Sequence, residues 1–163
     1  MDDLYDAPAT IQELVLFNDA IQRWEVSAPD QLPGYMKHFY QKILDTYNWI
    51  DDEMAKQGRS YRVEYAKSAF KDMARGYLAE AKWYHEGYVP SLEEYMRVGE
   101  LTSGLRSLAT ISFVGMGDLA TKADFDWIRS DPLIAQAAAV IGRLLDDCIP
   151  SRMGPPGIKH SGF

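Results

Sequence analysis

Apolar side chains recur along much of the chain at intervals of three and four residues, which is the spacing of one face of an α-helix. Between residues 34 and 56 they form a broad stripe followed by Gly58, a pattern typical of a core-facing helix and its end. The sequence contains no convincing alternation of polar and apolar residues and no Asn-Gly hairpin turn. We therefore predict an all-α fold.

Local start and stop signals divide this pattern into separate helices. Thr10 with Glu13, and Ser91 with Glu94, have the spacing of a capping box, in which two residues satisfy each other's backbone N–H groups at a helix start. Prolines, glycines and short polar stretches mark the ends. Helices are expected over residues 2–7, 10–24, 34–56, 59–84, 91–115, 123–129 and 133–147.

Two of these expected helices have unusual features. Thr102, Ser103 and Gly104 interrupt the segment 91–115, and such a cluster breaks or kinks a helix because it competes for backbone hydrogen bonds. The segment 133–147 is apolar on nearly all sides. A helix of that kind is expected in the middle of a bundle.

The domain boundary is expected where this last helix ends. Residues 1–147 form one partial helical domain in this interpretation, and residues 148–163 form an aberrant, disordered tail. Proline and glycine crowd into the tail, and no helix continues through them. These residues are Pro150, Gly154, Pro155, Pro156 and Gly157.

The composition indicates which kinds of partner the protein does not bind and in which cellular compartment it is expected. With 17 basic and 24 acidic residues the formal net charge is -7, which argues against a nucleic-acid partner. The single cysteine, Cys148, forms no internal disulfide, and no apolar run is long enough to span a bilayer. We expect a cytoplasmic protein without a membrane span, unless an N-terminal transit peptide precedes the given sequence.

The acidic residues near the N-terminus are candidate metal ligands. In a helix, Asp6 lies close to both Asp2 and Asp3 because the intervals are three and four residues. A divalent cation such as Mg²⁺ would relieve the repulsion between the three carboxylates. A solvated acidic terminus explains the same residues equally well.

A second acidic pair, Asp146 and Asp147, follows the most apolar helix. Arg143 lies three and four residues earlier, so it either neutralises the pair or presents its guanidinium to a phosphate group. The pattern does not decide between these roles. Asp51 and Asp52 serve as a comparison, since their polar surroundings indicate an exposed helix end without chemistry.

The segment DDLYD at residues 2–6 resembles the DDxxD metal motif of class I terpene synthases. The segments AIQRWE at 20–25, LPGYM at 32–36, EGYVP at 86–90 and SFVGMG at 112–117 are similar to segments that occur in this order in plant members. The resemblance covers residues 2–147. It implies the helical metal-binding domain of a sesquiterpene synthase-like plant enzyme, with the isoprenoid synthase fold.

The resemblance also implies roles for individual residues. Asp2 and Asp3 would be catalytic, and together with Asp6 and Asp146 they would hold Mg²⁺, or Mn²⁺, against the diphosphate of the substrate. Arg143 would bind the same diphosphate. The break at Thr102, Ser103 and Gly104 would turn carbonyl dipoles towards the carbocation, which aromatic rings would also stabilise. Farnesyl diphosphate is the expected substrate.

The second metal motif of the family is incomplete in this chain. Counting from Asp146, its hydroxyl position holds Pro150 and its glutamate position holds Gly154. We therefore expect a truncated or aberrantly spliced gene product that exposes apolar surface and self-associates. The alternative to an active enzyme is a catalytically inactive helical fragment, and an isoprenoid chain-elongating enzyme is a distant third interpretation.

Overall fold

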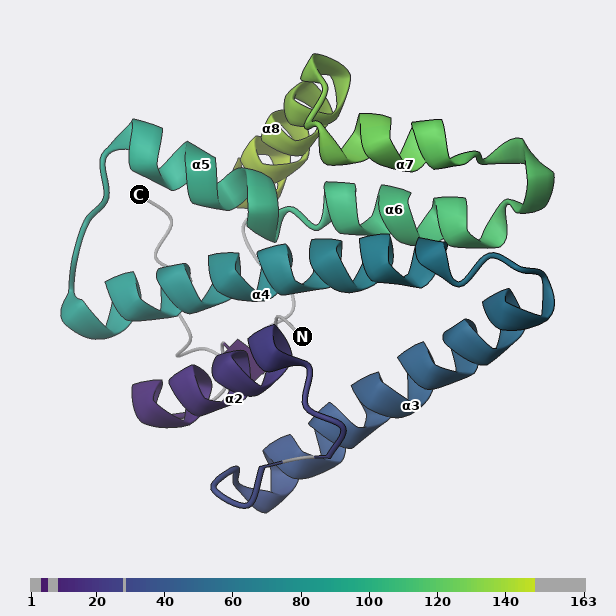
Figure 1. The fold of residues 1–163 in the computed structure, drawn as a ribbon. Helices are drawn as coiled ribbons and strands as arrows, with labels where there is room; N and C mark the ends of the chain where they lie inside the picture. The colour runs from purple at the N-terminus through teal and green to yellow at the C-terminus, as the bar shows by residue number, and fades with distance from the viewer. Residues whose placement is uncertain (1–3, 6–8, 28, 149–163) are drawn as a thin grey trace.

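The computed structural model describes residues 4–5, 9–27 and 29–148, and within them it contains helices and loops but no strand, which confirms the all-α prediction. Figure 1 shows the course of the chain. The helices are α2 (Ile11–Arg23), α3 (Gly34–Lys56), α4 (Tyr61–Glu86), α5 (Leu92–Thr102), α6 (Leu105–Gly115), α7 (Lys122–Arg129) and α8 (Leu133–Cys148).

The helix boundaries follow from local capping chemistry. At the start of α2, the backbone N–H of Thr10 donates to the carboxylate of Glu13 at 2.9 Å, while the Thr10 hydroxyl accepts from the Glu13 backbone. Ser91 and Glu94 form the same reciprocal pair before α5. Both predicted capping boxes are therefore confirmed. A third one, between Thr121 and Asp124 at the start of α7, was missed because the acid is aspartate rather than glutamate.

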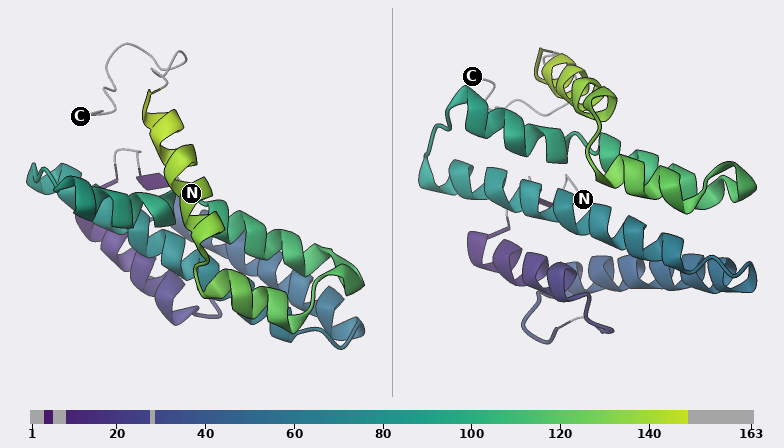
Figure 2. Two further views of the ribbon diagram at one scale, coloured as in Figure 1. Left: turned by 90° about the horizontal axis from the view of Figure 1, so that it is seen from above. Right: turned by 45° about the horizontal axis from the view of Figure 1, so that its top comes forward.

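The helices form layers around α4, as the views in Figures 1 and 2 show. Helices α2 and α3 lie on one side of α4, and α5 and α6 follow one another along its other side. Helix α8 crosses over the outer side of α5 and α6. Helix α4, the longest of these helices with 26 residues, thus contacts both layers.

Aromatic side chains hold the layers together. Tyr5, Phe17 and Tyr40 belong to one core cluster between α2, α3 and α4, and Phe17 and Tyr40 are fully buried. A second cluster near the other end of α4 contains Phe125, and Trp24 packs against both clusters. Aromatic residues therefore make up a large part of both core clusters, as expected.

Arg62 is a buried cation at the start of α4. Its guanidinium donates to the carbonyl oxygens of Val114 at 3.2 Å, Gly117 at 2.8 Å and Ala120 at 2.5 Å, and it lies over the ring of Phe125. These carbonyls belong to the end of α6 and the connection to α7. A single side chain thereby satisfies backbone groups that the end of a helix leaves without partners.

The expectation that residues 133–147 form a helix in the middle of a bundle is wrong for this structure. Only Ala135 and Ala139 of α8 are buried, while Leu133 is 81% exposed and Ile141 is 59% exposed. The reason is that α8 packs against α5 and α6 with one face only. No helix in the described part of the chain is long and apolar enough to cross a membrane.

Candidate functional site

The predicted break in the helix at residues 102–104 is present. Helix α5 ends at Thr102, Gly104 has a left-handed backbone with φ of 72°, and α6 begins at Leu105. The two hydroxyl groups at the break are engaged, because Thr102 Oγ1 donates to Glu80 Oε1 at 2.7 Å and Ser103 Oγ donates to the Glu100 carbonyl at 2.9 Å. The break is thus a fixed structure with a carboxylate beside it.

Helix α4 holds this break in place. A Cβ atom on Gly76 would lie 2.9 Å from the Thr102 methyl group, so the missing side chain permits the close approach of the two helices. One residue later, the hydroxyl of Tyr77 donates to the Thr102 carbonyl oxygen at 3.3 Å. The end of α5 is therefore tied to one short stretch of α4.

Tyr5, a residue of the N-terminal aspartate motif, packs on the same stretch of α4. Tyr5, which lies between Asp3 and Asp6 in the sequence, is only 7% exposed, and its ring stacks on the Tyr77 ring with centroids 5.6 Å apart. Asp2, Asp3 and Asp6 themselves lie outside the described residues, so their role as metal ligands stays a prediction. Tyr5 itself is packed on the residue of α4 that bonds to the helix break.

Arg143 of α8 lies against the backbone of α5. A Cβ on Gly99 would lie 3.1 Å from Arg143 Cγ and 3.4 Å from Cδ, so the arginine stem occupies the space that the glycine leaves open. At its end, Nε and Nη2 donate to Asp147 Oδ1 at 3.0 and 2.7 Å, and Nη2 also donates to Asp146 Oδ2 at 2.5 Å. Of the two roles that the sequence left open for Arg143, the structure shows the neutralisation of both aspartates.

The two aspartates differ in their surroundings. Asp147 has a side chain that is 30% exposed, and its second oxygen accepts a hydrogen bond from the Tyr95 hydroxyl at 2.5 Å. Asp146 has a side chain that is 73% exposed, and within the described part of the chain its Oδ1 has no hydrogen-bond partner. Asp147 is thus held within the protein, whereas Asp146 presents a carboxylate oxygen to solvent.

The surroundings of Arg143 and Tyr95 raise the pKa of both groups. Burial opposes the charge of Arg143, but its bonds to Asp147 and the charges around it outweigh that effect and raise the pKa of the guanidinium. Burial, followed by the hydrogen bond to Asp147, raises the pKa of Tyr95 above that of a free phenol. Arg143 is therefore a cation and Tyr95 a hydrogen-bond donor throughout the neutral range.

Asp146 fits a magnesium ion as a single ligand. Its free carboxylate oxygen is a ligand atom that Mg²⁺ prefers. Mg²⁺ commonly binds one or two carboxylates together with water and substrate phosphate. The described residues contain no group of three or more His, Cys, Asp or Glu side chains that could hold a metal ion. The Pro150 and Gly154 positions of the incomplete second motif lie outside the described residues.

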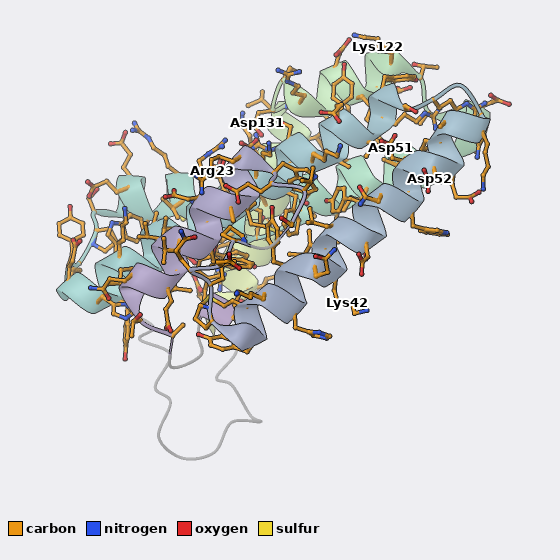
Figure 3. All side chains as sticks on the ribbon, turned by 60° about the horizontal axis from the view of Figure 1, so that its bottom comes forward. Arg23, Lys42, Asp51, Asp52, Lys122 and Asp131 are labelled. Atoms are coloured by element: carbon orange, nitrogen blue, oxygen red, sulfur yellow. The ribbon has the colours of Figure 1, made fainter. Side chains whose placement is uncertain are left out.

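Three residues that build this site were not predicted from the sequence. Tyr95 and Gly99 are one turn apart on α5 and both contact α8, while Glu80 lies on α4 beside Thr102. The four-residue spacing of Tyr95 and Gly99 is compatible with a shared face, but nothing in the sequence indicates that α8 lies opposite. Asp51 and Asp52, the comparison pair, lie near the end of α3 (Figure 3).

The sequence profile described as "Terpene synthase family, metal binding domain" matches residues 1–152. The chain belongs to the terpene synthase family. The resemblance inferred from the DDxxD-like segment and the four further segments is thereby confirmed.

Curated members of the family are similar over nearly the whole chain. Sesquiterpene synthase 2 of Toona sinensis is 54% identical over 147 residues, which are 90% of this chain and 26% of that enzyme. Valencene synthase of Vitis vinifera is 53% identical over 147 residues, again 90% of this chain and 26% of the enzyme. The chain thus spans about a quarter of the length of the terpene synthases that it matches.

Solved terpene synthases have the same helical fold. Isoprene synthase from grey poplar (Populus x canescens), in complex with three Mg²⁺ ions and dimethylallyl-S-thiolodiphosphate, superposes with a TM-score of 0.81 at 28% identity, over 90% of this chain and 28% of that enzyme. Abietadiene synthase from Abies grandis gives a TM-score of 0.80 at 32% identity, over 90% of this chain and 19% of that enzyme. The predicted isoprenoid synthase fold is confirmed.

Proposed function

We propose that this chain carries the diphosphate-ionising site of a sesquiterpene synthase. The observation that supports this most strongly is the geometry of Arg143. Its stem is fixed on Gly99, and its Nε–Nη2 edge is bound by two aspartates. The remaining Nη1 group has no partner among the described residues and is a two-donor site for a phosphate oxygen.

The proposed reaction begins with loss of diphosphate from a prenyl substrate. Arg143 would orient the diphosphate through Nη1 and stabilise the negative charge that develops on the departing oxygen. Asp2, Asp3, Asp6 and Asp146 would hold magnesium, which when bound supplies Lewis-acid stabilisation of the same leaving group.

The helix break has a separate proposed role after ionisation. The break at Gly104 ends α5, and the carbonyls of its last turn accept from the backbone N–H groups of Ser103 and Gly104 and from the hydroxyls of Ser103 and Tyr77, so they would act on a carbocation through their dipoles. The carbonyl end of a helix also carries a partial negative charge. The last turn of α5 would therefore stabilise a carbocation near Thr102 and Ser103.

The substrate and metal are proposed by similarity to relatives. Relatives at 50–54% identity are described as sesquiterpene synthases, which favours farnesyl diphosphate as the substrate. The poplar isoprene synthase complex contains Mg²⁺, which supports magnesium as the cofactor. Manganese has similar oxygen-ligand chemistry and is proposed as a substitute.

Turnover by the purified chain tests this function. Farnesyl and geranyl diphosphate would be supplied with Mg²⁺ or with a chelator, and both volatile products and released diphosphate would be measured. We expect Mg²⁺-dependent product from farnesyl diphosphate, loss of that product in the Asp2→Ala/Asp3→Ala variant, and retention in a matched Asp51→Ala/Asp52→Ala variant. No turnover by folded protein would favour the catalytically inactive fragment instead.

A further inference from the structure

Tyr95 is a residue of α5 whose side chain contacts α8. It lies one helical turn before Gly99, and both residues face Arg143 and its aspartates. Gly99 receives the aliphatic stem of Arg143, whereas the Tyr95 hydroxyl binds the carboxylate that holds the guanidinium. Helix α5 thus fixes the arginine at two points, one direct and one through Asp147.

The charges around Arg143 explain why the contact that runs from Tyr95 through Asp147 is important. Two carboxylates share one guanidinium, and three of its hydrogen-bond contacts are directed at Asp146 and Asp147. Two carboxylates offset the charge of the guanidinium and so weaken its attraction for a diphosphate. The attraction is kept only if both carboxylates stay on one edge of the guanidinium and leave the other edge open. Tyr95 takes Oδ2 of Asp147, which leaves only Oδ1 for the Nε–Nη2 edge of the arginine.

We infer that Tyr95 is a positioning residue for diphosphate binding, acting through Asp147 on Arg143. Its hydroxyl fixes the Asp147 carboxylate, the carboxylate fixes the Nε–Nη2 edge, and the Nη1 edge is left facing the substrate. This inference rests on the proposed role of Arg143 as the diphosphate ligand. Without the Tyr95 hydroxyl, Asp147 is free to rotate and to compete with the diphosphate for the arginine.

Tyr88, in the connection between α4 and α5, offers a matched control. The hydroxyl of Tyr88 also donates to a carboxylate, that of Glu94, at 3.1 and 3.2 Å. This second tyrosine–carboxylate pair lies at the start of α5 and is exposed. Tyr88→Phe therefore removes a comparable hydrogen bond without acting on Arg143.

The first measurement detects the position of the arginine without any ligand. In wild-type protein the Arg143 Nε–H, assigned by its loss in Arg143→Lys, is hydrogen-bonded to Asp147 and should give a resolved NMR signal with slow hydrogen exchange. We expect Tyr95→Phe to accelerate this exchange and Tyr88→Phe to leave it unchanged. An unchanged Arg143 signal in Tyr95→Phe would overturn the inference.

The second measurement follows binding of inorganic diphosphate in the presence of Mg²⁺ by titration calorimetry. Loss of a hydrogen bond to a charged group corresponds to about tenfold weaker binding, which we expect for Tyr95→Phe. We also expect Asp147→Asn to weaken binding, and the double variant to bind no more weakly than Asp147→Asn alone. Additive losses in the double variant would contradict action through Asp147.

The two proposals fail in distinguishable ways. If wild type and Arg143→Met bind diphosphate equally, the proposed role of Arg143 is wrong, whatever Tyr95 does. If Arg143→Met loses binding while Tyr95→Phe binds like wild type, Arg143 is the ligand and the inference about Tyr95 is wrong. Tyr88→Phe is expected to bind like wild type in both cases.

Discussion

The ring of Tyr5 stacks on the ring of Tyr77, with centroids 5.6 Å apart and an interplanar angle of 26°. Tyr77 in turn donates from its hydroxyl to the Thr102 carbonyl. Tyr5, the fourth residue of the five-residue aspartate motif, is therefore connected, through one side chain of α4, to the break between α5 and α6. This connection links the first predicted metal-binding segment to the rest of the site.

Two substitutions distinguish the contribution of the Tyr77 ring to stability from the contribution of its hydroxyl group. Tyr77→Phe keeps the stack but removes the bond to Thr102, so we expect it to lower the free energy of unfolding by about 1 kcal/mol. Tyr77→Ala removes the ring and opens a cavity beside the buried Tyr5, which should cost about 2–4 kcal/mol. Urea denaturation measures both. Equal losses in the two variants would show that the stack contributes little.

The left-handed glycine at the helix break gives a second prediction. Gly104 has a φ of 72°, so Gly104→Ala strains the backbone and should lower the free energy of unfolding by about 1–2 kcal/mol. Gly142 is a matched control, because it lies inside α8 and a Cβ there would meet nothing within 4 Å. We expect Gly142→Ala to stabilise the protein by about 0.5–1 kcal/mol.

Both glycine variants are compared by thermal and denaturant unfolding. Stabilisation by Gly104→Ala would mean that α5 and α6 are able to join into one continuous helix. That result would contradict the account of a fixed break between Thr102 and Leu105.

The capping box of α5 predicts a dependence of stability on pH. The backbone N–H of Ser91, and then its side chain and Tyr88, lower the pKa of Glu94 from its ordinary value of 4.5. Because the folded pKa is depressed, this stabilisation is fully present above pH 4.5 and is lost as the pH falls through the lower folded pKa. Glu94→Gln should therefore show a weaker decline of unfolding free energy in acid than wild type.

A neighbouring acid serves as the control for this pH series. Glu93 lies in the same first turn, and its carboxylate accepts from the Arg97 side chain rather than from a backbone N–H. We expect Glu93→Gln to retain the acid-dependent decline of wild type. The capping explanation fails if the two glutamine variants give the same profile between about pH 3 and pH 6.

The exposed face of α8 predicts self-association. Ile134 is 68% exposed, Ile141 is 59% exposed, and Leu145 is 60% exposed, so an apolar stripe runs along this helix. Contiguous apolar surface of this kind favours association in water. We expect the sedimentation coefficient to rise with protein concentration, and Ile141→Glu to suppress this rise.

Val26 provides the matched control for this surface. It is 94% exposed but lies between α2 and α3, away from α8, so Val26→Glu adds the same charge elsewhere. We expect Val26→Glu to associate like wild type. A wild-type protein that sediments as a monomer at all concentrations would contradict self-association through the exposed face of α8.

Features that depend on neighbouring residues were predictable from the sequence. Apolar spacing and the pairs Thr10–Glu13 and Ser91–Glu94 located helices, and Thr102 with Gly104 located the break, because these signals act within a few residues. The bonds from Arg143 to its aspartates span one helical turn, so the sequence suggested them as well.

Features that depend on packing between helices were not predictable. The Tyr95–Asp147 bond joins residues 52 positions apart, and no local pattern marks either as a partner of the other. The same holds for Gly99, whose missing side chain matters only because Arg143 lies over it. The exposure of α8 was mispredicted because an apolar pattern shows what a helix could bury, and not what packs against it.

The most direct test of the account locates the metal ion itself. Mn²⁺ is paramagnetic and broadens NMR signals of nearby residues, so it can be titrated into labelled protein together with inorganic diphosphate. We predict broadening around the last turn of α5 and around Arg143 and Asp146, with loss of this effect in Asp2→Asn/Asp3→Asn. Broadening centred on Asp51 and Asp52 of α3, or broadening that persists in the double variant, would contradict a metal site shared by the aspartate motif and α8.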